Sequence, residues 1–184
     1  MILDYDQAQS FLFPGRLFSF INPVNKVSVK RHIKSLIKIR KYDLNAEFCS
    51  MQLHTAGLLA IQSRKLLLAF SNNKQCFYLP GGKIDKGETA TNALCREIRE
   101  ELNIVLREDD LEYYTHISAP AFGENIGVIM EQDCFLINKT VTPVASAEIS
   151  AIKYFSLNEY LEQTAKAPGA VMILEKLQAD NLID

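Results

Sequence analysis

The sequence lacks closely spaced cysteines. Its four cysteines, Cys49, Cys76, Cys95 and Cys134, lie far apart, form no C-x-x-C pair and have no histidine nearby at a zinc-ligand spacing. This pattern argues against a zinc site of the common kinds. We therefore expect reduced thiols, most of them buried in the core.

Long apolar runs are also absent, and so are internal repeats and low-complexity tracts. No stretch approaches the roughly 18 continuous apolar residues that a membrane-spanning helix needs. The N-terminus opens with Asp4 and Asp6 instead of a basic run, and the apolar residues 11–13 stop at Pro14 and Gly15, unlike a secretory signal. We therefore expect no membrane association and a cytoplasmic location.

Acidic residues are missing between Lys26 and Lys41, a stretch that holds seven lysines and arginines. Since the formal net charge is -2, the rest of the chain must be distinctly acidic. Apolar side chains recur from Val29 to Ile37 at helical spacing, which predicts a basic amphipathic helix. Its lysines are expected on a solvated face. The alternatives are a cover for the domain, a homodimer surface, or binding of nucleic acid or an acidic partner; no aromatics interleave with the basic residues, which disfavours nucleic acid.

The length of 184 residues, with 48% hydrophobic and 23% charged residues, is typical of a globular protein with one good core. Residues 1–50 read as an N-terminal extension, in which an apolar arm broken by Pro14, Gly15 and Pro23 precedes the basic helix. Residues 51–184 read as the main domain.

Short β-rich runs and helical patterns alternate in the main domain. A hairpin is expected from residues 56–61 and 66–70, and Pro80 to Gly82 is expected to break the chain into a loop. Further strands are predicted at 77–79, 113–117, 127–136 and 152–155, and helices at 89–102, at 158–163 and after Pro168. This order predicts an α/β or α+β sandwich.

The helix predicted at 89–102 carries the chemistry. Glu97, Glu100 and Glu101 are three and four residues apart, so their side chains are expected on one face. Like charges at these spacings destabilise a helix by about 0.2–0.5 kcal/mol per pair. A hard divalent cation such as Mg²⁺ would compensate. For an arbitrary helix, an acidic face solvated and relieved by Arg96 and Arg99 is the more common arrangement.

On its other side the same helix has an apolar ridge. Leu94, Ile98 and Leu102 recur every four residues, so they are expected to anchor the helix in the core. Thr89 is a suitable N-cap.

Residues 82–104 resemble the Nudix box. That pattern is a glycine, five residues, a glutamate, seven residues, then Arg-Glu, an aliphatic residue, any residue, Glu-Glu, any residue, glycine and an aliphatic residue. Gly82, Glu88 and the segment 96–104 match every specified position except Asn103, which replaces the glycine. Asparagine tolerates the left-handed backbone expected there. The residues 78–83 are similar to the family's entry into the box.

The resemblance implies an α/β/α sandwich with a mixed sheet, and Mg²⁺-dependent hydrolysis of a phosphoanhydride by water, with Mn²⁺ as the alternative ion. The implied substrate is a nucleotide-derived small molecule: a nucleoside diphosphate derivative such as ADP-ribose or a nucleotide sugar, or a modified nucleoside triphosphate. The alternative is a non-catalytic module that senses nucleotides or binds a partner. The implied site residues are Glu97, Glu100, Glu101 and the Gly81 carbonyl as metal ligands, with Arg96 orienting Glu97 and Glu88 holding the loop.

The general base and the base-binding residues stay open. A box glutamate such as Glu97 or Glu101 is one candidate base; Glu148, just before the strand predicted at 152–155, is the other, unless it is only a loop carboxylate. Pro120 resembles a proline of the ADP-ribose-hydrolysing branch, but a loop breaker is the simpler interpretation. Phe122 and Tyr78 are either base-stacking or packing residues.

Overall fold

The computed structural model describes residues 51–184. The predicted N-terminal extension, with its apolar arm and its basic helix, lies outside the described residues, and so does Cys49. Cys76 and Cys134 are buried, Cys95 is half-buried, and all three are free thiols, as expected.

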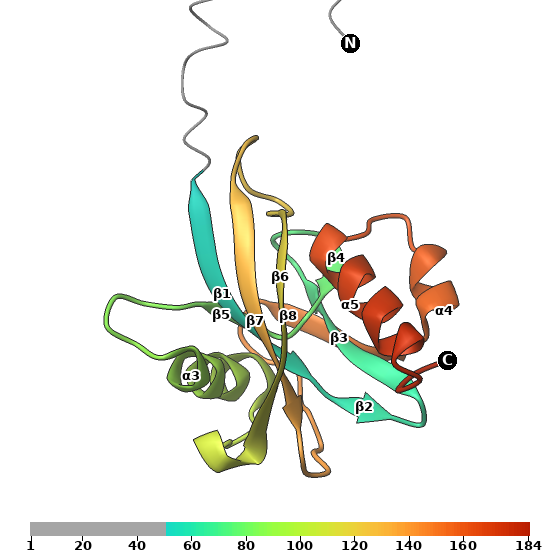
Figure 1. The fold of residues 1–184 in the computed structure, drawn as a ribbon, viewed down its shortest axis with the longest axis horizontal. Helices are drawn as coiled ribbons and strands as arrows, with labels where there is room; N and C mark the ends of the chain where they lie inside the picture. Colours follow the sequence, from blue (N-terminus) through green and yellow to red (C-terminus); the bar gives the residue numbers. More distant parts are fainter. Residues whose placement is uncertain (1–50) are drawn as a thin grey trace, which may run out of the picture. The chain divides into compact units, whose positions relative to one another are not determined.

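A mixed four-stranded sheet forms the centre of the domain (Figure 1). Its order is β5-β1-β7-β6, and the strands are β1 (Gln52–Leu59), β5 (Gly81–Lys83), β6 (Leu111–Pro120) and β7 (Ile129–Ile137). The two long inner strands, β1 and β7, run parallel, while the outer pairs are antiparallel. The mixed sheet that the family resemblance implied is therefore confirmed.

A second sheet is built around β3 (Lys65–Ser71). It pairs antiparallel with β2 (Ile61–Gln62), β4 (Cys76–Tyr78) and β8 (Ile149–Phe155). Between β2 and β3 the chain turns through Ser63 and Arg64, whose φ angles are 48° and 59°. Two successive positive φ angles are typical of a tight hairpin turn.

Two details of the strand prediction are wrong. In the hairpin predicted from residues 56–61 and 66–70, only the short β2 pairs with β3. Residues 56–59 belong instead to β1 of the other sheet, and residues 55–60 are all buried. The segment expected to be a loop forms β5, because Gly81 lets it lie close against β1. A Cβ on Gly81 would be 2.2 Å from the Ala56 carbonyl oxygen.

The longest helix, α3 (Ala90–Leu102), begins and ends where the sequence predicts. The Thr89 hydroxyl accepts a hydrogen bond from the Asn92 N–H (3.1 Å), which satisfies one free donor of the first turn. Leu94, Ile98 and Leu102 are fully buried, as expected.

The other helices lie on the opposite side of the central strands from α3 (Figure 1). They are α4 (Leu157–Leu161) and α5 (Pro168–Ala179), both close to their predicted positions. A short 3₁₀ helix, η1 (Glu108–Asp110), has no counterpart in the prediction. The α/β class with helices on both sides is confirmed.

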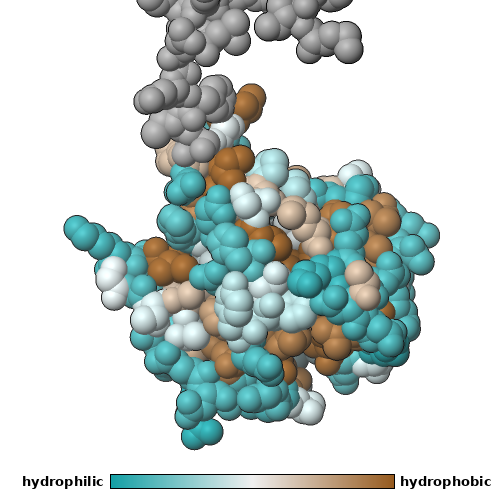
Figure 2. All heavy atoms as spheres, viewed as in Figure 1, coloured by the Kyte–Doolittle hydropathy of each residue, from teal (hydrophilic) through white to brown (hydrophobic). Residues whose placement is uncertain are grey.

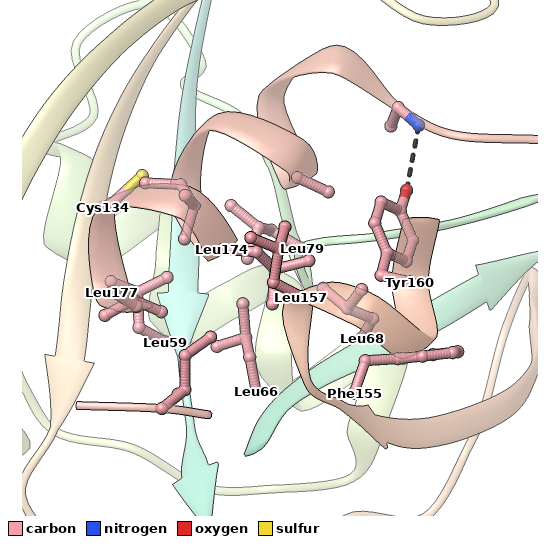
Figure 3. Packing of buried hydrophobic residues seen from close by; sticks show 14 of the residues in the cluster. Leu59, Leu66, Leu68, Leu79, Cys134, Phe155, Leu157, Tyr160, Leu174 and Leu177 are labelled. Carbon is pink, nitrogen blue, oxygen red and sulfur yellow. Dashed lines mark hydrogen bonds between the residues drawn. The ribbon is translucent and has the colours of Figure 1, made fainter. Parts of the chain in front are cut away.

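Two apolar clusters hold these layers together. One joins α3 to the face of β1 that carries Ala56 and Leu58. The other lies beneath α4 and α5, where Figure 3 shows side chains from β1, β3, β8 and α5 packed around Leu157 and Tyr160. The buried Tyr160 hydroxyl donates to the Phe77 carbonyl (2.7 Å) and accepts from the Ala167 N–H (2.9 Å). The two clusters thereby fix both sheets relative to α3, α4 and α5.

The face of the domain seen in Figure 2 carries hydrophilic side chains interspersed with apolar ones. Several large apolar side chains are exposed on separate segments, among them Val105 and Ile126. No helix in residues 51–184 is long and apolar enough to cross a membrane.

Candidate active site

Glu101 on α3 is a buried carboxylate, with only 2% of its surface exposed. It accepts hydrogen bonds from the Gly81 N–H (2.8 Å) and from the Tyr78 hydroxyl (3.0 Å). Burial raises the pKa of Glu101 to about 7; the two hydrogen bonds oppose this rise, and the nearby charges of Glu148 and Glu97 add to it. A carboxyl group with a pKa near neutrality is suited to proton transfer or to binding a cation.

Arg96 connects two glutamates of the box. Its guanidinium donates to Glu97 (2.7 Å), to both carboxylate oxygens of Glu88 (3.1 and 2.9 Å) and to the Lys83 carbonyl (3.1 Å). These bonds hold the pKa of Glu88 below its usual value. Glu88 also accepts from the Asp85 N–H (3.2 Å), so it ties the loop before α3 to the helix.

Gly82 lets this loop pass directly over Glu97. A Cβ on Gly82 would lie 2.4 Å from the Glu97 carboxyl carbon and 2.5 and 2.7 Å from its two oxygens. These distances are far shorter than normal van der Waals contact, so any side chain here would displace the carboxylate. The glycine that begins the box is therefore required by the position of the carboxylate beneath it.

A later loop covers the C-terminal end of α3. Asn103 adopts the expected left-handed conformation, with a φ of 53°, and ends the helix. The last carbonyls of the helix accept hydrogen bonds from the loop: Glu101 O from the Ser146 N–H (2.8 Å) and Leu102 O from the Val144 N–H (2.9 Å). These two hydrogen bonds anchor the loop, and the exposed Glu148 that follows it lines the same cleft as Glu101.

Glu97, Glu101 and Glu148 line one cleft with a volume of about 440 Å³. Such a volume is within the usual range for a small-molecule site. Lys83 also lines the cleft, with its ammonium 4.0 Å from a Glu124 oxygen. Next to this acidic part lies a smaller recess of about 60 Å³, lined mainly by apolar side chains.

The cleft does not include Glu100. Its side chain is exposed and borders a separate hollow with Arg99 and Val105. The shared face expected for the three box glutamates is therefore observed only for Glu97 and Glu101. Residues one position apart on a helix differ by about 100° in direction, so the rotation that buries Glu101 turns Glu100 outward.

Other predicted residues lie at the cleft. The Gly81 backbone lines it, and Tyr78 and Phe122 border both the cleft and the recess, whereas Pro120 ends β6 and borders only the recess. The sequence reasoning missed Gln132, a buried polar residue of β7 that borders both. Gln132 stands between Glu131 and Asp133 in the sequence, so no local signal distinguishes it from these two polar neighbours.

Oxygen-rich side chains at the cleft match what Mg²⁺ or Mn²⁺ takes as ligands. Glu97 and Glu148 are close enough to raise the pKa of the buried Glu101, a repulsion that a divalent cation would neutralise. In the described part of the chain, no three acidic, histidine or cysteine side chains converge on one point. The donor set therefore fits a hard cation, provided that side chains rotate when it binds.

Known proteins share this domain. A family model described as the NUDIX domain matches residues 51–176. The chain is similar to an ADP-ribose pyrophosphatase of Methanocaldococcus jannaschii, with 31% identity over 97 residues. That match covers 52% of this chain and 54% of the relative, so the chain spans about half the length of that protein.

Solved structures have the same fold. The MutT protein from Methanosarcina mazei Go1 gives a TM-score of 0.59 at 17% identity, covering 72% of this chain and 97% of that one. The ORF135 protein of E. coli gives 0.55 at 26% identity, covering 73% and 96%. Since the family model covers most of the chain, and Arg96 joins Glu88 and Glu97 of the box beside the cleft, the chain belongs to the Nudix hydrolase family.

Proposed function

We propose that the protein is a Mg²⁺-dependent pyrophosphohydrolase that cleaves a phosphoanhydride bond in a nucleoside diphosphate derivative, with ADP-ribose as the first candidate. Mn²⁺ is the alternative ion. The observation that carries the proposal is the cleft itself, where carboxylates from α3 and from the loop before β8 face the same space. The similarity to an ADP-ribose pyrophosphatase supports the choice of substrate.

The residues of the Nudix box and the Gly81 carbonyl have distinct proposed roles. Glu97 and Glu101, with Glu100 and the Gly81 carbonyl, would hold the ion; Glu100 would have to join from its exposed position. Arg96 fixes the Glu97 carboxylate through a 2.7 Å hydrogen bond, and Glu88 fixes Arg96 through two more. The bound cation would supply charge neutralisation at the phosphates and polarise the attacked phosphorus.

The general base is proposed among the carboxylates of the cleft. Glu101 has a pKa of about 7, which suits proton transfer near neutral pH, but its two oxygens already accept hydrogen bonds from Gly81 and Tyr78. Glu148 is exposed and has no side-chain hydrogen bond among residues 51–184, so its carboxylate is free to approach a water molecule in the cleft. We favour Glu148 as the base and Glu101 as a ligand.

A second candidate function is a non-catalytic nucleotide-binding module. The burial of Glu101 and its hydrogen bonds favour it, because a carboxylate already occupied in this way needs a rearrangement before it can bind an ion.

A substrate panel separates the two functions. The full chain is incubated with ADP-ribose, nucleotide sugars, dinucleoside polyphosphates, and normal and oxidised nucleoside triphosphates, with Mg²⁺ or with a chelator. Cleavage of ADP-ribose that the chelator abolishes is the expected result. Nucleotide binding without cleavage of any compound would instead establish the binding module.

A further inference from the structure

Gln132 is a largely buried residue at the edge of the apolar recess, and its side-chain amide has no hydrogen-bond partner within residues 51–184. It lies on β7, opposite Thr55 of β1, and 6% of its surface is exposed. Among residues 51–184, neither its side-chain oxygen nor its NH₂ group makes a hydrogen bond. No fully buried side-chain nitrogen or oxygen in residues 51–184 lacks a hydrogen-bond partner, so the Gln132 amide atoms reach the hollow, where a ligand can replace water as their partner.

The position of the amide is set by a missing side chain. Gly57 on β1 lies beside it, and a Cβ at Gly57 would be 3.0 Å from both the carbon and the nitrogen of the Gln132 amide. This contact is tighter than packing normally allows, so the glycine provides the space that the amide occupies. The amide therefore lies against Gly57 of β1, where Gln132 lines the cleft.

The surroundings of the amide suit a flat aromatic ring. Phe122 and Tyr78 border both the acidic cleft and the recess, together with Gln132, while Met130 and Leu79 add apolar contacts. The Lys74 ammonium lies 5.5 Å from the centre of the Tyr78 ring. One hollow thus combines a carboxylate-lined part, suited to a cation and phosphates, with an apolar part that contains a single unpaired amide.

We propose that the Gln132 amide recognises the nucleobase of the bound nucleotide, and that the preferred base is adenine. The inference rests on the proposed function only in taking the ligand to be a nucleotide. A glutamine amide pairs with the amino group of adenine and an adjacent ring nitrogen through two hydrogen bonds. The other common bases carry carbonyl oxygens, and guanine carries a further amino group, which one amide in an apolar recess leaves unpaired.

Binding of AMP tests the inference without turnover, since AMP has no phosphoanhydride bond. Isothermal titration calorimetry of the full chain with AMP and with GMP is carried out in the presence of a chelator. The wild-type protein is expected to bind AMP more tightly than GMP by about tenfold. Gln132→Met, which keeps the length of the side chain, is expected to weaken AMP binding about tenfold and to remove the preference.

Gln132→Glu provides a readout that a merely structural role would not change. A carboxylate accepts two hydrogen bonds but donates none, so it matches the two adjacent N–H groups of guanine instead of adenine. The preference is expected to shift from AMP toward GMP, and because both ligands carry the same phosphate, the added charge cancels in the ratio. Gln62→Met is the matched control: Gln62 is exposed on β2 and borders neither the cleft nor the recess.

Three outcomes would overturn the inference: no AMP binding by the wild-type protein, equal binding of AMP and GMP, or an unchanged ratio in both Gln132 variants. Failure of the proposed hydrolysis is a separate result. If AMP binds through Gln132 while ADP-ribose stays intact, the inference holds and the proposed function fails.

Discussion

Replacing Glu101 with glutamine should stabilise the metal-free protein while abolishing its metal-dependent turnover. Glutamine has the same shape as glutamate, and its amide oxygen can still accept the Gly81 N–H. What the substitution removes is a negative charge on a group with 2% of its surface exposed. Glu101, which we propose as a metal ligand, is therefore a residue whose negative charge destabilises the metal-free fold.

The expected gain in stability follows from the pKa of Glu101. Burial raises it from 4.5 to about 7, so the folded protein binds the proton more tightly than the unfolded chain does. Protonated Glu101 therefore contributes its full share to the free energy of unfolding below pH 4.5, and this contribution is lost as the pH rises through about 7. A difference between 4.5 and about 7 corresponds to about 3 kcal/mol at higher pH. For a domain of this size it would shift Tm by roughly 6–12 °C.

Urea unfolding with a chelator at about pH 5 and about pH 8 measures this effect. At the higher pH, the free energy of unfolding of Glu101→Gln should exceed that of the wild-type protein. At the lower pH, the two values should differ little. Glu100→Gln is the matched control, because Glu100 is exposed and its charge stays in water. Equal stability of the wild-type protein and Glu101→Gln at both pH values would refute the reasoning from burial.

Three further predictions concern the surroundings of the site. Arg96→Met should lower kcat on the order of 100-fold, because Glu97 loses its 2.7 Å hydrogen bond and Glu88 its partner; steady-state kinetics checks this, and unchanged kcat would exclude the orienting role. Thr89→Ala should lower the free energy of unfolding by about 1 kcal/mol through loss of the N-cap, while Thr89→Ser should not. Hydrogen bonds to Asp133 and Glu131 raise the pKa of His116 above 6.5, so its stabilisation is present below 6.5 and is lost as the pH rises through the raised pKa; in thermal melts, His116→Gln should lack this loss.

Local signals made α3 predictable from the sequence. Thr89 supplied the start, Asn103 the left-handed end, and the ridge of Leu94, Ile98 and Leu102 the buried side. Each of these depends on residues within a few positions of one another. The box of fixed spacings on this helix then indicated the family before any tertiary contact was known.

Features that depend on distant partners could not be predicted. The pairing of β1 with β7 joins residues 52–59 to residues 129–136, and an apolar run does not state which sheet it enters. The contrast between the buried Glu101 and the exposed Glu100 depends on how α3 is rotated against β1 and β5. Gln132 becomes notable only when β7 lies beside Gly57, because only then does its amide border the cleft.

Hydrolysis of ADP-ribose by the purified full chain tests the central claim most directly. The release of AMP and ribose 5-phosphate is followed by ion-exchange chromatography, with Mg²⁺, with Mn²⁺ and with a chelator, for the wild-type protein and for Glu97→Gln. We predict release of both products with a divalent ion, none with the chelator, and a large loss in the variant. Cleavage that persists in the chelator, or that Glu97→Gln leaves at the wild-type rate, would contradict the assignment of this cleft as a metal-dependent active site.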